Sequence, residues 1–308
     1  MLASYNLQST FKVYSFYNIS LTPWIIGAVL ALAVAYCLFG GGKRILKATS
    51  VLVPIMGCAY IVVALIVTVL NITALPSVFA RIFKEAFDLT AIFGGFTGSC
   101  VMYGIKRGLF SNEAGVGSAP NASASADVNH PVKQGLVQVL SVFIDTLLVC
   151  SATAFMCMCS GIEPDAALDG AKYVQQALSV TLGSFGSVFI TVAMILFAFT
   201  TLLGNLYYVE QCFFYLFKRK PGRTFDICYR VVASLLILFG AVLSADLLWG
   251  IADVTMGLMT VINIPVICIL GRYALRALKD YEGKRNSKES ISFKASDIGL
   301  KDLDGWED

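Results

Sequence analysis

Two short motifs place polar side chains inside otherwise apolar runs, and both have chemistry suited to charge or cation binding. Asp145 lies within VFIDTL (142–147), and Thr200 and Thr201 lie within FAFTTL (197–202). A carboxylate at membrane depth is costly, so it faces a cavity or a partner, or it anchors a backbone break in a neighbouring helix. Hydroxyl oxygens are hard ligands for a small cation, but helical threonines also bond back to their own backbone. The residues alone leave both alternatives open.

A polar, glycine-rich stretch occupies the middle of the chain. Residues 107–120 read RGLFSNEAGVGSAP and follow another glycine-studded run, GGFTGSCVMYG (94–104). Glycine adopts positive φ and allows close backbone approach, while Asn and Ser bond their own backbone, so such a stretch turns or unwinds. An interrupted membrane helix of this kind is one way of making a solute site inside a bilayer. Glu113 is expected at its cytoplasmic mouth, paired with a basic side chain or with the polar stretch.

Several function classes are disfavoured by what the sequence contains. It has no nucleophile next to a base, no histidine pair and no nucleotide-binding loop, so we predict a protein that is not an enzyme. The nine cysteines fit no metal spacing and the single histidine, His130, lies far from the closest cysteine pair, so no metal site is predicted. The net charge of +3 is explained by the distribution of basic residues between loops, so no nucleic-acid partner is predicted.

The elements that must position these residues are predicted to be membrane-spanning helices. Hydrophobic residues make up 57% of the 308 residues and the mean hydropathy is +0.75, which indicates a polytopic membrane protein. We therefore predict an all-α integral membrane fold, with a transmembrane domain over 1–271 and a polar tail over 272–308. An amphipathic helix is expected at 76–89, where apolar residues recur at helical spacing among charged ones. Seven spans are expected, at 23–39, 51–70, 91–105, 135–159, 185–217, 227–243 and 247–270.

Basic residues predict the orientation of these spans in the cell membrane. One set of connections, together with the start of the tail, holds most of the Lys and Arg, including Lys43, Arg44, Lys106, Arg107 and the basic turn at 218–223. The other set holds few. By the positive-inside rule the first set is cytoplasmic, so the N-terminus is predicted outside and the C-terminus inside. The cytoplasmic tail is expected to be a frayed helix followed by disorder.

Several of these motifs resemble those of a known family. The stretch 107–120 is similar to the signature run of the alanine or glycine:cation symporter family, the sodium:alanine symporters. HPVKQGLV (130–137), FIDT (143–146), FAFTTLLG (197–204) and DLLWGIAD (246–253) resemble other runs of that family. The resemblance covers essentially the whole chain from the first span to the tail.

The resemblance implies a leucine-transporter-type fold, with two inverted five-helix repeats and broken helices at the substrate site. The chain would supply the last seven core helices, its third span being the first, broken helix of the second repeat. Thr200 and Thr201 match the hydroxyl pair that usually serves the sodium site. The substrate site would include Gly94, Gly95, Phe96, Thr97, Gly98 and Asn205. The inner gate and its structural supports would include Arg107, Ser111, Asn112, Glu113 and Asp145, the last organising the second repeat.

Asn205 marks a departure from the family pattern. After the glycine equivalent to Gly204 the family usually carries an aromatic residue, in a pattern similar to LGWxYYGE, whereas this chain reads GNLYYVE (204–210). The wall of the implied pocket is therefore altered, and with it the substrate side chain that the pocket accepts.

The resemblance implies symport of a small neutral amino acid, alanine or glycine, with sodium, or alternatively protons, as the coupling ion. No cofactor is expected besides the coupling ion. The resemblance also implies that the family's helices before the first span are absent. The chain is therefore predicted to be a truncated form that does not catalyse uptake alone. The alternative is a seven-helix receptor or interaction subunit, or an inactive fragment. A receptor, however, has no need for a glycine-rich break at the end of its third span.

Overall fold

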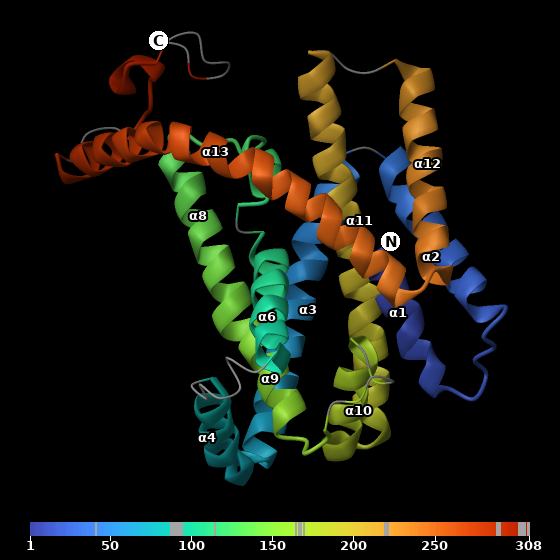
Figure 1. The fold of residues 1–308 in the computed structure, drawn as a ribbon. Helices are drawn as coiled ribbons and strands as arrows, with labels where there is room; N and C mark the ends of the chain where they lie inside the picture. Colours follow the sequence, from blue (N-terminus) through green and yellow to red (C-terminus); the bar gives the residue numbers. More distant parts are fainter. Residues whose placement is uncertain are drawn as a thin grey trace. The chain divides into compact units, whose positions relative to one another are not determined.

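The computed structural model describes residues 1–40, 42–86, 95–113, 115–163, 165, 168, 170–218, 222–287, 291–300 and 306, and these ranges contain helices and no strand (Figure 1). Six helical segments within them are long and apolar enough to cross a membrane. They are Thr22–Phe39, Lys47–Leu70, Pro131–Met158, Ser184–Phe217, Arg223–Val242 and Ala245–Asn286. The all-helical membrane fold is therefore confirmed, but the number of seven spans is not.

The third predicted span, 91–105, is the one that does not qualify. Residues 91–94 lie outside the described residues, and helix α6 (Gly95–Asn112) contains Lys106, Arg107 and several glycine, serine and threonine residues. These residues lower its hydropathy below that of a lipid-spanning helix.

The chain divides into two compact units. Unit 1 comprises Met1–Val101 and Leu147–Ala252, and unit 2 comprises Met102–Thr146 and Asp253–Asp308. Helix α6 and helix α13 (Ala245–Asn286) each contribute residues to both units.

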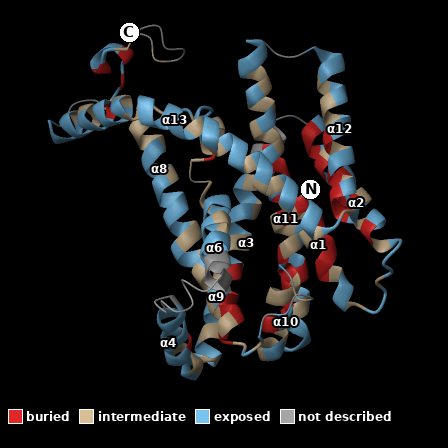
Figure 2. Ribbon diagram, viewed as in Figure 1, coloured by how far each residue is buried: buried red, intermediate tan, exposed pale blue. Residues whose placement is uncertain are grey.

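Unit 1 is centred on helices α2 (Thr22–Phe39), α11 (Ser184–Phe217) and α12 (Arg223–Val242). Their buried apolar side chains, among them Val34, Leu203 and Ile237, form one cluster, which accounts for much of the buried ribbon in Figure 2. A Cβ added to Gly27 of α2 would lie 3.0 Å from the Ala241 Cβ of α12. The absence of a side chain at this position therefore lets α2 and α12 pack closely.

Two helices of unit 1 were not expected from the sequence. Helices α1 (Leu2–Thr10) and α10 (Ala171–Leu182) both pack against α11. The buried Gln175 joins all three helices, because its Nε2 donates to Thr10 O at 3.1 Å and to Thr191 Oγ1 at 3.0 Å. Helices α1 and α10 thus pack against α11 partly through hydrogen-bonded polar side chains. A search for apolar periodicity does not detect such helices.

A second apolar cluster joins α3 (Gly42–Leu70), α9 (Ser151–Met158) and α11. At its centre Tyr60 shares a 2.8 Å hydrogen bond with Thr153. The amphipathic helix α4 (Leu75–Ala86) corresponds to the one predicted at 76–89, of which residues 87–89 are outside the described residues. An ion pair joins α4 to the segment after α9, since Arg81 Nη1 lies 3.0 Å from Glu163 Oε1.

The bounds of the other spans agree with the prediction for some helices and differ for others. Helix α11 and helix α12 begin and end within four residues of the predicted spans at 185–217 and 227–243. The span predicted at 135–159 is α8 (Pro131–Phe143), the π-helix η3 (Ile144–Cys150) and α9 in series. Helix α13 continues to Asn286, 16 residues beyond the predicted end at 270. Hydropathy marks the apolar part of such a helix, not its hydrogen-bonded length.

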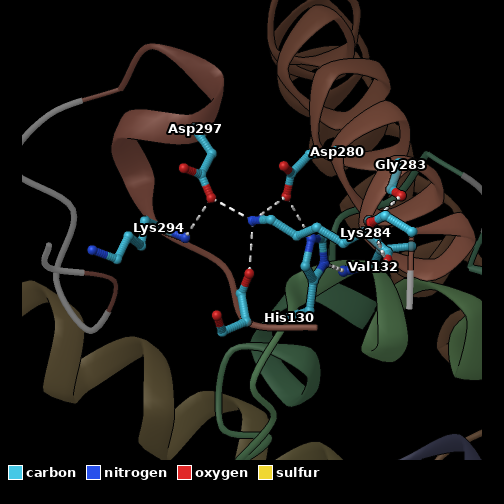
Figure 3. A network of polar contacts seen from close by, with 9 residues as sticks. His130, Val132, Asp280, Gly283, Lys284, Lys294 and Asp297 are labelled. Carbon is cyan, nitrogen blue, oxygen red and sulfur yellow. Dashed lines mark hydrogen bonds and ion pairs between the residues drawn. The ribbon is translucent and has the colours of Figure 1, made fainter. Parts of the chain in front are cut away.

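The tail differs most from expectation, because part of it is ordered against the end of α13 in unit 2. We call residues 291–300, which include the 3-10 helix η4 (Ala295–Ile298), the C-terminal clasp. Figure 3 shows Lys284 between two carboxylates, with Nζ 2.9 Å from Asp280 Oδ2 and 2.5 Å from Asp297 Oδ2. The Lys284 Nζ also donates to Ser292 O at 2.8 Å. A polar sequence is therefore held in place by charge pairing, which composition alone does not reveal.

His130, at the start of α8, contacts both the end of α13 and the C-terminal clasp. His130 is fully buried and caps α8, because its Nδ1 accepts a hydrogen bond from the Val132 N–H at 3.2 Å (Figure 3). Since Nδ1 is the acceptor, the ring proton lies on Nε2. This Nε2 is 3.2 Å from Asp280 Oδ2. Its ring meets Phe293 of the clasp edge to face at 5.1 Å. The clasp thus links the start of α8 to the end of α13.

We expect the clasp to loosen in acid. The hydrogen bond from Lys284 lowers the pKa of Asp297 below its ordinary value of 3.8. Because the folded-state pKa is depressed, the stabilisation is fully present above pH 3.8 and is lost as the pH falls through the folded-state value. Fluorescence of Trp306, which packs against Phe293, would report this in a Trp24→Phe, Trp249→Phe background. Asp297→Asn should loosen the clasp already at neutral pH. Identical pH profiles for the two proteins would contradict the assignment.

Candidate functional site

The break in the polar stretch lies later than the sequence indicated. Helix α6 continues through Lys106 and Arg107 to Asn112, and the turn begins at Glu113. Among the described residues of this turn, three have positive φ: Glu113 at 50°, Gly115 at 78° and Gly117 at 97°. Since left-handed backbone is accessible mainly to glycine, the glycines of the signature stretch are the residues that allow this turn. We call Glu113 and residues 115–118 the signature loop.

Two consecutive residues at the end of α6 hydrogen-bond two consecutive residues of the next span. Ser111 Oγ donates to Asp145 Oδ2 at 2.7 Å, and Thr146 Oγ1 donates to Asn112 Oδ1 at 2.5 Å. Asp145 and Thr146 lie at the start of the π-helix η3. A π-helical turn is rare and widens the helix locally, and such turns are frequent at functional sites. The structure therefore brings together the predicted gate residues Ser111, Asn112 and Asp145, and adds Thr146.

Arg107 has a carboxylate partner that the sequence analysis did not assign to it. Its Nη1 lies 3.2 Å from Asp253 Oδ1, and Lys106 Nζ lies 3.3 Å from Asp253 Oδ2. One aspartate of α13 thus binds two successive cations of α6. Asp253 could have been suspected because it is an ionisable residue within an apolar run, which calls for a partner.

Glu113 is paired within its own loop. Ser118 Oγ donates to Glu113 Oε2 at 2.6 Å, which closes the turn from Glu113 to Ser118. This agrees with the alternative in which Glu113 pairs with the polar stretch.

The predicted substrate residues of the glycine run lie in helix as far as they are described. Gly94 is outside the described residues, and Gly95, Phe96, Thr97 and Gly98 belong to the first turns of α6. Their backbone is helical in this structure, so the exposed, unwound backbone expected at these positions is not what it shows. Their assignment to substrate binding stays a prediction.

The predicted sodium residues lie on α11. Thr200 is 6% exposed, and its Oγ1 donates to Leu196 O at 2.9 Å and lies 3.2 Å from Phe197 O. This is the bond back to the helix backbone that the sequence analysis kept as the alternative to cation binding. Thr201 and Asn205 are exposed. The cation and substrate roles of these three residues stay predictions.

The predicted site residues fall into two groups. Thr200, Thr201, Asn205 and the described residues of the glycine run belong to unit 1. Arg107, Ser111, Asn112, Glu113 and Asp145 belong to unit 2. Arg107 contacts α13, Ser111 and Asn112 contact η3, and Glu113 is paired within the signature loop. Within the second group, Ser111 and Asp145 are in direct contact with each other.

These features define a multi-pass, all-helical membrane protein with a polar break at the end of one helix. The chain belongs to the sodium:alanine symporter family, since a model of that family matches residues 1–295. It is 41% identical over 285 residues to the amino-acid carrier protein AlsT of Bacillus subtilis (strain 168), with 92% of this chain and 60% of AlsT covered.

Other relatives carry more specific names. The chain is 36% identical over 321 residues to the sodium/proton-dependent alanine carrier protein of Bacillus sp. (strain PS3), covering 98% of this chain and 71% of that protein. It is 41% identical over 270 residues to the probable sodium/glutamine symporter GlnT of Bacillus subtilis (strain 168), covering 87% and 56%. The chain spans about three-fifths of the length of the curated relatives that it matches.

The family match corrects one expectation. It begins at residue 1 and is not confined to the part after the first predicted span. The expectations that the chain resembles only the C-terminal two-thirds of the family, and that it lacks the family's N-terminal helices, are therefore not borne out.

Proposed function

We propose that this protein carries out sodium-coupled symport of a small neutral amino acid, alanine or glycine, across the cell membrane. The observation that carries the proposal is the family match over residues 1–295. It is supported by six helices able to cross a membrane and by relatives named as alanine carriers. No resident cofactor is invoked, because the sodium gradient supplies the free energy for uptake.

In this proposal the substrate binds near the midplane of a leucine-transporter-type fold, where the polar ends of the amino acid meet backbone at broken helices. Gly94 to Gly98 and Asn205 are the residues assigned to it. Sodium is held by the hydroxyl oxygens of Thr200 and Thr201, since small hard cations prefer oxygen ligands. For Thr200 this requires its Oγ1 lone pairs to turn to the ion while its hydrogen stays on the helix carbonyl.

The signature loop and its neighbours form the inner gate of the proposed transporter. The contacts of Ser111 with Asp145 and of Arg107 with Asp253 are polar bonds between helices, and a gate can break and remake such bonds. The N-terminus is placed outside and the C-terminus in the cytoplasm, on the distribution of basic residues.

The proposal is tested with the full chain reconstituted in lipid vesicles. An inward sodium gradient should drive accumulation of radiolabelled alanine, whereas an equal potassium gradient should not. A proton gradient imposed alone tests the other coupling ion. Because relatives are named for alanine and for glutamine, excess unlabelled alanine, glycine and glutamine should be compared as competitors.

Two results would overturn the proposal. Uptake that does not depend on the sodium gradient would remove sodium as the coupling ion. Binding of alanine to vesicles that show no gradient-driven accumulation would favour the receptor or interaction-subunit alternative.

A further inference from the structure

Asn263 of α13 contacts the signature loop at its two glycines. We propose that Asn263 is a positioning residue that holds the signature loop against α13 and so sets the rate of the gating step. The inference rests on the proposed transport function, but its central contact can be tested without transport.

The first support is a hydrogen bond. Asn263 Nδ2 donates to the carbonyl oxygen of Gly115 at 3.0 Å, joining residues that are 148 positions apart in the sequence. Both belong to unit 2. The carbonyl of a residue with positive φ has no helical partner, so a side-chain amide is a suitable donor for it.

The second support is the fit between the glycines and the same face of α13. A Cβ added to Gly117 would lie 2.9 Å from Asn263 Cγ and 3.1 Å from its Nδ2. A Cβ added to Gly115 would lie 3.3 Å from Ile264 Cγ1. The glycines are thus required twice, for positive φ and for close approach to α13. Val116, between them, is 4% exposed, so the loop is packed and not merely a surface turn.

The third support is the position of Asn263 on its helix. Pro265 follows two residues later and cannot donate a backbone hydrogen bond, which makes this part of α13 easier to bend. Asp253, which binds Lys106 and Arg107, lies ten residues earlier on α13, or about 15 Å along the helix. The α6 end and the signature loop are therefore attached to α13 at two separate points. Any movement of the loop away from α13 must break the bond from Asn263.

This geometry predicts an effect on turnover and not on substrate binding. Asn263 is not among the residues assigned to alanine or sodium, so its loss should leave both half-saturation concentrations unchanged. A loop that is no longer held in its working position slows or uncouples the conformational step, which appears in kcat.

The experiment uses Asn263→Asp in the full chain, because the carboxylate has nearly the same size and loses the donor that Gly115 accepts from. In vesicles we expect kcat for sodium-driven alanine uptake to fall at least about tenfold, with KM for alanine and for sodium within about twofold of the unmodified chain. Hydrogen–deuterium exchange of a peptide covering 107–120 should become faster. Thr260→Val is the matched control, since it removes only the Oγ1 that bonds Met256 O of its own helix and keeps the methyl carbon that faces Gly115.

A second substitution approaches the same contact from the loop. Gly117→Ala should give the same exchange and kcat phenotype, whereas Gly108→Ala, in the same polar stretch but with no atom within 4 Å of an added Cβ, should not. Because both changes break one contact, the double variant Asn263→Asp, Gly117→Ala should lose less activity than the product of the two single losses.

The outcomes separate this inference from the proposed function. If the unmodified chain shows no sodium-dependent uptake, the proposed function fails, and the exchange experiment still decides whether Asn263 holds the loop. If the chain transports but Asn263→Asp retains its kcat, or changes KM alone, the positioning role is overturned. Unchanged exchange at 107–120 in both Asn263→Asp and Gly117→Ala overturns it as well.

Discussion

Replacing Thr200 and Thr201 together by alanine is expected to raise the sodium concentration for half-maximal alanine uptake by at least about tenfold. If the two hydroxyls contribute oxygen ligands to sodium, their removal leaves the ion with fewer partners. Thr200 is nearly buried, so water does not readily replace its oxygen. The half-saturation constant for sodium should rise more than that for alanine.

The competing explanation makes a different prediction. The Oγ1 of Thr200 bonds the Leu196 and Phe197 carbonyls of its own helix, and a hydroxyl used only in this way contributes little to stability. In that case the double alanine variant should retain its sodium dependence. The double serine variant is the matched control, because it keeps both oxygen atoms and removes only the methyl groups. An unchanged sodium response in the alanine variant removes both threonines from the site.

The second large effect is expected from Asp253→Asn. This change removes the charge shared by Lys106 and Arg107, whose side chains are 41% and 34% exposed beside an aspartate that is 27% exposed. Removing one partner from a fully buried ion pair costs about 3–5 kcal/mol, and for this partly exposed group we expect about 1–3 kcal/mol of folding stability. Transport should fall with it, because the end of α6 loses its attachment to α13.

Thermal unfolding in detergent measures the first effect and vesicle uptake measures the second. Asp246→Asn is the control, since Asp246 is an exposed aspartate near the start of the same helix. Adding Lys106→Met to Asp253→Asn should restore part of the stability, because it removes one of the two cations left without the shared carboxylate. If Asp253→Asn unfolds at the same temperature as the unmodified chain, the three-residue ion cluster does not support the fold.

The membrane-spanning helices were the most predictable part of the fold. The predicted span at 185–217 and the observed α11 (Ser184–Phe217) differ by one residue at the N-terminal end. An uninterrupted run of apolar residues needs no distant partner to be recognised, because its length alone exceeds what a lipid bilayer requires. The span predicted at 91–105 is only partly described, and α6 (Gly95–Asn112), which contains several glycines and two cations, is not among the six apolar segments.

Pairings between distant residues were not predictable in the same way. The sequence showed that Asp145 needs a cavity or a partner, but not that the partner would be Ser111, and it did not reveal that Asp253 pairs with Lys106 and Arg107. The polarity of a side chain shows that it cannot face lipid alone, whereas its partner depends on how helices far apart in the sequence lie against each other. For the same reason Gln175 and His130, both fully buried, escaped notice as structural centres.

By itself the sequence determined that this is an all-helical membrane protein, and its polar motifs indicated the symporter family. It also located the residues whose chemistry is unusual for lipid. Only the tertiary structure decided where the break after α6 begins, which carboxylate binds which cation, and that Asn263 lies against Gly115 and Gly117. Hydropathy and backbone preference are properties of neighbouring residues, but a hydrogen bond across 148 positions exists only once the helices have packed.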